Sequence, residues 1–210
     1  MGKVESNKQQ KEDSLLNTAF HLFTTKGLSK TSIAEISEKA GMAKGTFYLY
    51  FKDKYDIRNK LISHKSSQIF LNAAEAMKQE QIENFEDRII FLCDHIINQL
   101  SENQILLNFI SKNLSWGIFK EALTTNIQKE DIDFKEVYYK ILKESGIEFR
   151  DPEVMLFLIV ELVSSTCYST ILYKEPISIE ELKPDLYQVI RSIIENHKKK
   201  KSEVQDGTTT

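Results

Sequence analysis

Proline and glycine are scarce in this chain, and their scarcity constrains the fold more than any other feature of the sequence. The 210 residues include only three prolines, at positions 152, 176 and 184, and seven glycines. Because these two residue types are the strongest helix breakers, the long stretches without them favour helices. Apolar residues recur there at spacings of three and four, the period of an amphipathic helix. We therefore expect an all-α fold.

Three helices are expected before residue 55. The first ten residues are polar and are expected to be frayed, and an apolar helix face then runs from Leu15 to Phe23. Ser32 and Glu35 have the spacing of a capping box at the start of a second helix. The first helix is expected to end near Gly27, the second near Gly41, and the third to cover residues 43–50.

The remainder of the chain has a similar pattern. Asp53, Asp131 and Asp151 are each positioned to cap a following helix, and Pro152 is typical of a first helical turn. We expect the last helix to begin near Pro184. The other helices are expected over residues 53–77, 85–101, 104–119 with a weaker pattern to 128, 131–146 and 152–173, with a linker over 78–84.

Charge and apolar content indicate the environment of the protein. Residues 1–55 have a net charge of +3 and the remainder has −6, so the basic end is the part expected to meet a polyanion. The first 14 residues lack the apolar segment of a signal peptide, and the longest apolar run, 154–163, is too short for a bilayer. Both cysteines lie in apolar stretches and are expected to be reduced core thiols. We therefore expect a cytoplasmic protein without a membrane partner.

Residues 31–54 contain the most informative pattern. Two short helices joined by a glycine turn match the helix-turn-helix plan, in which the second helix enters the major groove of DNA. At about 100° per residue, a helix that turns Phe47 and Phe51 toward the core turns Gly45 and Leu49 outward. Gly45 lets the backbone approach DNA closely, and Leu49 can contact a thymine methyl group.

The neighbouring side chains suit contacts to the DNA backbone. Lys44 can reach a guanine edge or a phosphate, and the hydroxyls of Thr46, Tyr48 and Tyr50 can donate to phosphate oxygens. Lys54 lies in the first turn of the next helix, where a phosphate would also be bound favourably. The alternative is that the tyrosines and the leucine between them pack against another part of the chain.

This segment closely resembles the DNA-binding head of the tetracycline-repressor (TetR) family. The resemblance implies a DNA-binding domain over residues 1–55, a helical effector-binding and dimerisation domain over 56–200, a disordered tail over 201–210, and about nine helices. Many members have Ser where this chain has Ala43, so one hydroxyl is missing here. The matching residues are Ala19, Phe20, Phe23, Gly27, Thr31, Ser32, Ile33, Ile36, Ala40, Gly41, residues 44–48, Tyr50, Phe51, Lys52 and Lys54.

The family pattern also implies roles for individual residues. It implies that the last two helices form a four-helix bundle with a second copy. It assigns the groove and phosphate contacts to Lys44, Gly45, Thr46, Tyr48, Tyr50 and Lys54. Residues 154–163 are apolar almost all round, as expected for a dimer helix or for an internal helix of a monomer. The expected DNA-binding residues are Thr31, Ser32, Lys44, Gly45, Thr46, Tyr48, Leu49, Tyr50 and Lys54.

A ligand pocket is expected between the helices of the body. Glu161, a carboxylate within an apolar run, can bind a cationic or hydroxylated effector, pair across a dimer interface, or find a local partner. The other expected pocket residues are large and mostly aromatic: Phe109, Trp116, Phe119, Tyr138, Phe157 and Tyr168.

These features together predict a transcription regulator, by family habit a repressor, that binds a palindromic double-stranded operator as a homodimer. A small-molecule effector would release it by favouring a DNA-incompetent state, with the helix over 53–77 as the lever. The alternative is a DNA-bound adaptor that recruits a protein, which a solid body and an exposed apolar patch would favour. An enzyme is not expected, and neither is a metal or cofactor, because the four histidines are far apart and nucleotide-binding and hydrolase motifs are missing.

Overall fold

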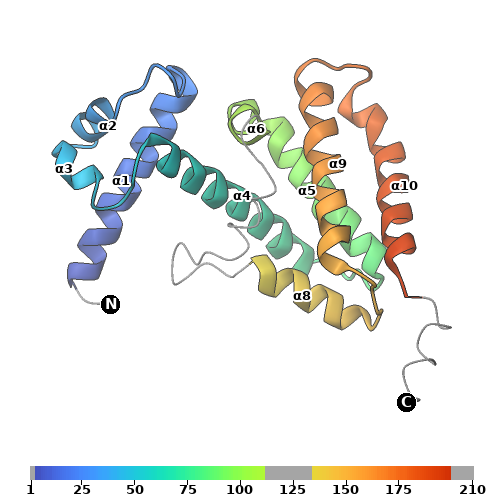
Figure 1. Ribbon diagram of the computed structural model, residues 1–210. Helices are drawn as coiled ribbons and strands as arrows, with labels where there is room; N and C mark the ends of the chain where they lie inside the picture. The colour runs from blue at the N-terminus through green and yellow to red at the C-terminus, as the bar shows by residue number, and fades with distance from the viewer. Residues whose placement is uncertain (1–2, 112–133, 200–210) are drawn as a thin grey trace, which may run out of the picture. The chain divides into compact units, whose positions relative to one another are not determined.

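The computed structural model of the protein describes residues 3–111 and 134–199, and these residues form nine α-helices and no strand (Figure 1). The all-α prediction is therefore confirmed for this part of the chain. The chain divides into two compact units, residues 1–65 and residues 66–210. The expected helical pattern beyond residue 111, the expected cap at Asp131 and the expected tail over 201–210 lie outside the described residues.

The first unit contains α1 (Lys3–Thr25), α2 (Ile33–Lys39), α3 (Lys44–Phe47) and the beginning of α4 (Lys54–Lys78). The expected fraying of the first ten residues is wrong, because α1 begins at Lys3. This segment is rich in Lys, Glu and Gln, which are good helix formers, and Gln9 donates a hydrogen bond of 3.2 Å to Asp13 one turn later. The third helix is shorter than expected, since residues 48–50 form a turn.

The start of α4 belongs to the first unit, so the boundary lies ten residues after the expected one. Asp53 caps the helix as expected: its Oδ1 accepts hydrogen bonds from the amides of Tyr55 and Asp56, at 2.8 and 2.9 Å. Hydrogen bonds from the same two amides lower the pKa of Asp53. Lys60, two turns along, donates to the Tyr50 carbonyl at 3.3 Å and lies 4.9 Å from the centre of the Phe51 ring. These contacts join the first turns of α4 to the helix-turn-helix segment.

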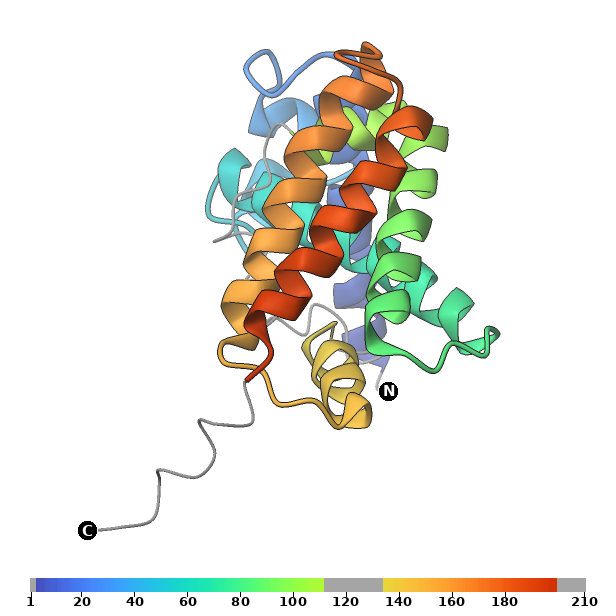
Figure 2. The same ribbon diagram turned by 90° about the vertical axis from the view of Figure 1, so that its right-hand side faces the viewer.

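The second unit continues with the remainder of α4 and five further helices. Its described elements are α5 (Phe85–Glu102), α6 (Gln104–Ser111), α8 (Phe134–Ser145), α9 (Pro152–Leu172) and α10 (Ile179–His197). Helices α9 and α10 pack side by side over much of their length (Figure 2). Asp151 caps α9 as expected, its carboxylate accepting from the Val154 amide at 3.5 Å.

The last helix begins earlier than the sequence predicts. It starts at Ile179 and carries Pro184 inside, so the expected start near Pro184 is wrong. The Ser178 side chain accepts from the Glu181 amide at 3.4 Å, and the Ser178 amide donates to the Glu181 carboxylate at 3.0 Å. This capping box satisfies amides at the helix start, whereas Pro184 removes only one backbone donor.

Helix α9 is apolar almost all round, with Glu161 as the charged residue in its middle. By length and composition it is long enough to cross a membrane, yet only 33% of its most apolar window is buried in the structure. One such helix among the described residues is weak evidence for a membrane span, because core helices of soluble proteins have the same composition. Much of this apolar helix is therefore exposed in the isolated chain.

A cluster of polar side chains joins α5 to α10. The carboxylate of Asp94 accepts hydrogen bonds from the Tyr187 hydroxyl and from the Asn98 amide, and it pairs with the Lys183 ammonium at 3.1 Å. Lys183 also donates to Asn98 at 2.7 Å. Burial, the largest single influence, raises the pKa of Asp94, but the hydrogen bonds from Tyr187 and Lys183 outweigh it and lower the pKa overall.

We predict that Asp94→Asn lowers the free energy of unfolding by about 1–2 kcal/mol at pH 7, as expected for lost hydrogen bonds to a charged group. Because the pKa of Asp94 is lowered in the folded state, its stabilisation is present above the ordinary value of 3.8 and is lost as the pH falls through the folded value. Urea unfolding at pH 7, 5 and 3 should show the difference between wild type and variant shrinking. The control is Glu102→Gln, an exposed acidic residue at the end of the same helix; an equal loss from it would contradict the assignment.

Candidate functional site

The segment around α3 presents one exposed and one buried side. Phe47 and Phe51 are almost wholly buried, with their ring centres 5.5 Å apart. Leu49 is 78% exposed and Tyr48 is 51% exposed, and the Tyr48 ring meets Phe47 edge to face at 5.6 Å. The predicted arrangement of faces is thus confirmed, and the alternative in which Tyr48 and Leu49 pack inside the molecule is wrong.

Gly45 lies on the same exposed side as Leu49. A Cβ atom added to Gly45 would meet nothing within 4 Å, and its backbone is not in the left-handed region. The fold therefore does not require glycine here, although glycine costs about 1 kcal/mol relative to alanine inside a helix. Lys44 is also exposed, whereas Thr46 and Tyr50 are half-buried. The side chains expected at the DNA contact thus lie at or near one accessible surface.

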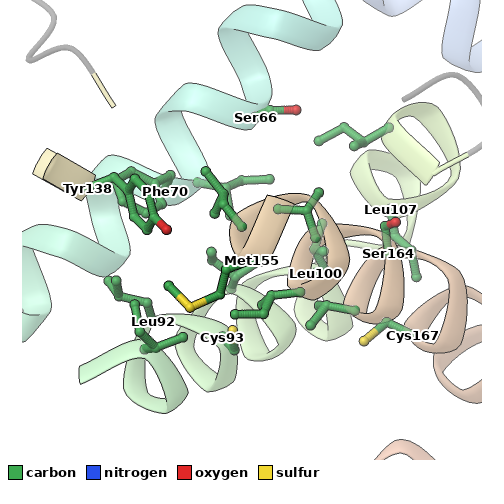
Figure 3. Close-up of a pocket in the computed structure, with 18 residues that line it drawn as sticks. Ser66, Phe70, Leu92, Cys93, Leu100, Leu107, Tyr138, Met155, Ser164 and Cys167 are labelled. Carbon is green, nitrogen blue, oxygen red and sulfur yellow. The ribbon is translucent and has the colours of Figure 1, made fainter. Parts of the chain in front are cut away.

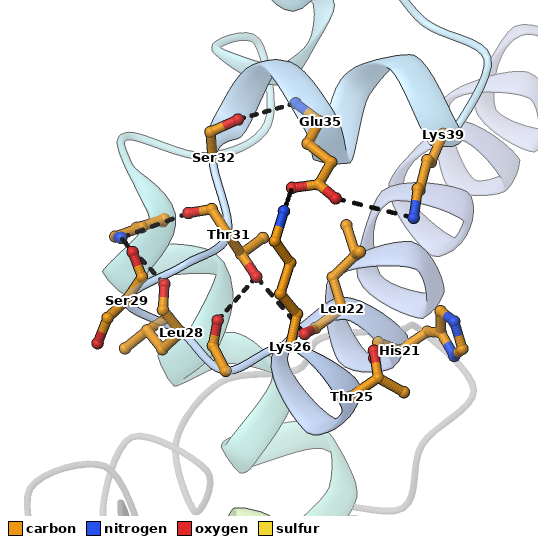
Figure 4. Close-up of polar contacts among 12 residues, drawn as sticks. His21, Leu22, Thr25, Lys26, Leu28, Ser29, Thr31, Ser32, Glu35 and Lys39 are labelled. Atoms are coloured by element: carbon orange, nitrogen blue, oxygen red, sulfur yellow. Dashed lines mark hydrogen bonds and ion pairs between the residues drawn. The ribbon is translucent and has the colours of Figure 1, made fainter.

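Thr31 lies behind this surface. It is only 2% exposed, and its hydroxyl donates to the Gly27 carbonyl at 2.8 Å (Figure 4). A hydroxyl that is buried and already bonded within the loop cannot reach DNA, so the expected DNA contact of Thr31 is wrong. Its side chain closes the turn between α1 and α2.

Lys54 has a second role in the same loop. Its ammonium donates to the backbone carbonyls of Leu28, Ser29 and Thr31, at 3.0, 3.4 and 3.4 Å. The sequence predicted a phosphate contact for Lys54 but did not indicate that these carbonyls lie close to it. The one sequence feature that pointed to this role is the position of Lys54 in the first turn of a helix. A cation there is unfavourable with the helix dipole, so it is expected to have another partner.

Ser32 begins α2 at an exposed position. Its Oγ accepts a hydrogen bond of 3.1 Å from the Glu35 amide, which confirms its capping role (Figure 4). The Glu35 carboxylate pairs with Lys26 at 2.7 Å and with Lys39 at 3.8 Å. The hydrogen bond from Lys26 is the main reason that the pKa of Glu35 is lowered. These pairs join α2 to the end of α1.

The second unit contains a cavity of about 140 Å³ between α4, α5, α6, α8 and α9 (Figure 3). Its wall is almost entirely apolar. Cys93 of α5 and Cys167 of α9 both lie on this wall as free thiols. Burial raises the pKa of Cys93 to about 12 and that of Cys167 to about 11, so both thiols stay protonated.

One of the expected pocket residues, Tyr138, lines the cavity. Its hydroxyl donates to the Pro152 carbonyl at 2.8 Å. Glu161 is exposed, so its expected place in the pocket is wrong. Phe109, Phe157 and Tyr168 are buried or half-buried and are not part of the wall. The expected pocket residues Trp116 and Phe119 lie outside the described part of the chain.

The sequence did not indicate most of the residues that line the cavity, and the reason is physical. Aliphatic side chains such as Ile89, Leu92 and Ile159 recur at helical spacing, and this pattern is the same whether they pack against each other or around a void. Only the positions of the helices decide between a filled core and a cavity.

Residues 15–61 match the family model described as bacterial regulatory proteins, tetR family. The chain is 27% identical over 145 residues to the uncharacterized HTH-type transcriptional regulator YerO of Bacillus subtilis. This match covers 68% of this chain and 45% of that protein. It is 42% identical over 73 residues to the uncharacterized HTH-type transcriptional regulator YvdT of Bacillus subtilis, covering 33% of this chain and 36% of that protein. The matched part therefore spans less than half the length of either relative.

The fold is shared with a solved structure as well. The transcriptional regulator FadR from Bacillus subtilis, in complex with stearoyl-CoA, has a TM-score of 0.60 and 19% identity, and the match covers 84% of this chain and 96% of that one. At this identity the likeness concerns the fold. Residues 15–61, with the helix-turn-helix geometry described above, are therefore identified as a DNA-binding domain of the tetR family of bacterial regulatory proteins.

Proposed function

We propose that the protein is a transcription repressor that binds a palindromic operator as a homodimer and is released by a small molecule bound in the second unit. The observation that carries the proposal is the exposed surface of Gly45, Tyr48 and Leu49, held in place by the buried Phe47 and Phe51. An exposed leucine beside a glycine that the fold does not require favours a surface shaped for an external partner. The family match over residues 15–61 supports DNA as that partner.

Each exposed side chain has a part in this proposal. Leu49 is more exposed than Tyr48 and contacts base edges in the major groove, with Gly45 allowing the backbone to approach. Lys44 supplies a cation for a guanine edge or a phosphate. Tyr48 donates its hydroxyl to a phosphate, which fixes the register of the helix without reading the sequence. Thr46, Tyr50 and the exposed Ser32 are further candidates for backbone contacts.

Lys54 takes a different part. Its ammonium holds the loop between α1 and α2 through three carbonyls, so we assign it as a positioning residue for the helix-turn-helix. The loop sets where α2 begins, and α2 packs against α3.

The dimer interface is assigned to α9 and its neighbour α10. Val154 and Leu158 of α9 are 43% and 39% exposed, and the exposed residues Glu161 and Ser165 continue the same stripe at spacings of three and four. Val189 of α10 is exposed as well. An apolar helix with one uncovered side is expected where a second copy packs, and the exposed position of Glu161 supports a role at this interface rather than in the cavity.

The cavity favours an effector over the adaptor alternative, which would be favoured by a solid body. Helix α4 supplies Ser66, Ile69 and Phe70 to the cavity wall, and its first turns pack with the helix-turn-helix. A ligand that prefers one position of α4 therefore shifts the population of DNA-competent dimers. The structure of FadR with stearoyl-CoA is an example of this fold with a small molecule bound.

We predict that selection of bound DNA from a random pool yields a palindrome, with half-site centres one helical turn, about 34–36 Å, apart. With the selected site, Leu49→Ala should change the preferred bases while leaving the salt dependence of binding unaltered. Tyr48→Phe should weaken binding about fivefold on every sequence, the effect of one lost hydrogen bond. The matched control is Tyr139→Phe, an exposed tyrosine of α8. Protein that selects no sequence, or variants that bind like wild type in a mobility-shift assay, would refute the proposed surface.

A second prediction separates positioning from phosphate contact at Lys54. Lys54→Met should lower the free energy of unfolding by about 1 kcal/mol and weaken operator binding, yet the slope of log affinity against log salt should not change. Lys44→Met is the control, and a lost phosphate contact should reduce its slope by about 0.9. A slope reduced equally in the Lys54 variant would show that the ammonium leaves the loop for DNA.

A third prediction concerns the assembly. Leu158→Arg places a charge on the exposed side of α9 and should convert the dimer to a monomer, as measured by light scattering on eluted protein. Ile105→Arg, at an exposed position of α6, should leave the dimer intact. Operator affinity should fall only in the Leu158 variant; a wild-type monomer would refute this part of the proposal.

A further inference from the structure

The chemistry of the cavity wall restricts the ligand to an uncharged molecule. None of the described residues that line the cavity is charged, and most of them are Ile, Leu or Val. A charged group placed among these side chains would lose its hydration without gaining a partner. A ligand that carries a carboxylate, an ammonium or a phosphate group is therefore excluded from the cavity.

The volume of the cavity restricts the ligand to a small molecule. The cavity measures about 140 Å³. An engineered apolar cavity of about 150 Å³ in another protein stays dry and binds benzene or xenon. A single six-membered ring with a small substituent therefore fits the space between these helices, whereas a fused ring system or a long chain exceeds it.

Sulfur-containing and aromatic side chains on the wall favour an aromatic ring over a saturated one. Cys93 of α5 and Met155 and Cys167 of α9 bring sulfur atoms to the wall (Figure 3). Phe70 of α4 and Tyr138 of α8 bring aromatic rings. Sulfur atoms are polarisable and make favourable contacts with aromatic rings, and aromatic rings also attract one another. A saturated ring of the same size gains neither kind of contact.

One hydroxyl among the described wall residues has no partner. The hydroxyls of Tyr138 and Ser164 are satisfied, donating to the carbonyls of Pro152 and Glu161 at 2.8 and 3.3 Å. The Oγ atom of Ser66, on α4, is buried and forms no hydrogen bond with any described residue (Figure 3). Buried polar atoms without a partner are rare in folded proteins, and a single neutral hydroxyl on the ligand would satisfy this one.

We propose that the cavity binds a small monocyclic phenol, with its ring among the sulfur-containing side chains and its hydroxyl hydrogen-bonded to Ser66. A phenol remains uncharged at pH 7, because the pKa of a phenolic hydroxyl is about 10, as in tyrosine. Its one hydroxyl therefore requires only the one partner that this wall offers. The role of the phenol as the effector rests on the proposed function, but its binding does not.

The test is calorimetric titration of the full chain without DNA at pH 7, using phenol, cyclohexanol, benzoate and 1-naphthol. Phenol should show saturable binding. Cyclohexanol has a saturated ring and should bind about threefold more weakly, because it lacks the sulfur–aromatic contacts. Benzoate is charged and 1-naphthol is too large, so each should bind at least about tenfold more weakly than phenol. The proposal is overturned if any of these three binds as tightly as phenol, or if phenol does not saturate.

The serine variant tests the hydrogen bond. Ser66→Ala should weaken phenol binding about fivefold, the effect of one lost hydrogen bond. It should leave the affinity for toluene unchanged, because toluene has a ring of the same size without a hydroxyl. The matched control is Ser67→Ala, half-buried on the same helix but outside the wall. An unchanged affinity for phenol in the Ser66 variant, or an equal loss for phenol and toluene, overturns the proposal.

A cavity-filling variant locates the site. Ile96→Trp places a larger side chain on the wall and should weaken phenol binding at least about tenfold, because little free volume would remain. Ile90→Trp, half-buried on the same helix but outside this wall, should bind phenol like wild type. Equal affinities in the two variants overturn the proposal. If Ile96→Trp does not fold, the Ser66 comparison decides, since it removes a single oxygen atom.

The same compounds separate this inference from the proposed function. Phenol that binds with the expected order of affinities but does not release the selected operator supports the ligand class and refutes its role as effector. Operator release by a charged or larger compound, with phenol unbound, overturns the ligand class and leaves the regulator intact.

Discussion

The burial of Phe47 and Phe51 is the interaction on which the exposed surface depends. Helix α3 has only four residues, so its own hydrogen bonds cannot fix the direction in which its side chains point. The two phenylalanines, in contact with each other and excluded from solvent, fix that direction by packing. Gly45 and Leu49 face outward as a consequence. A change in either ring would therefore disturb the exposed surface without altering any residue on it.

The loop between α1 and α2 is held by a separate set of contacts. The Thr31 hydroxyl donates a hydrogen bond to the Gly27 carbonyl just after α1. The Lys54 ammonium donates to three further backbone carbonyls of the residues that follow Gly27. A cation at the start of a helix is unfavourable with the helix dipole, and the loop carbonyls offset that cost. This arrangement explains how residues that resemble DNA contacts in the sequence can serve the fold of the head instead.

Helix α9 has two different sides in the second unit. One side, with Met155, Ile159 and Cys167, lines the cavity, and the other, with Val154 and Leu158, is exposed. A helix that is apolar all round suits both surroundings, which is why its composition also resembles that of a membrane span. In the proposed dimer this one element would carry both the ligand site and the subunit interface, so that a ligand along one side affects the packing of the other.

The sequence by itself determined the helical class, most helix boundaries, the caps at Asp53 and Asp151, and the outward face of α3, because these depend on local periodicity and on hydrogen bonds between near neighbours. It failed where distant segments meet: Thr31 proved buried, Lys54 bound carbonyls more than twenty residues away, Glu161 faced outward, and an aliphatic core pattern enclosed a cavity. Only the tertiary structure decided these features. Which polar groups meet, and whether apolar side chains fill the space between helices, depends on the positions of the helices in space, and no spacing along the chain encodes them directly.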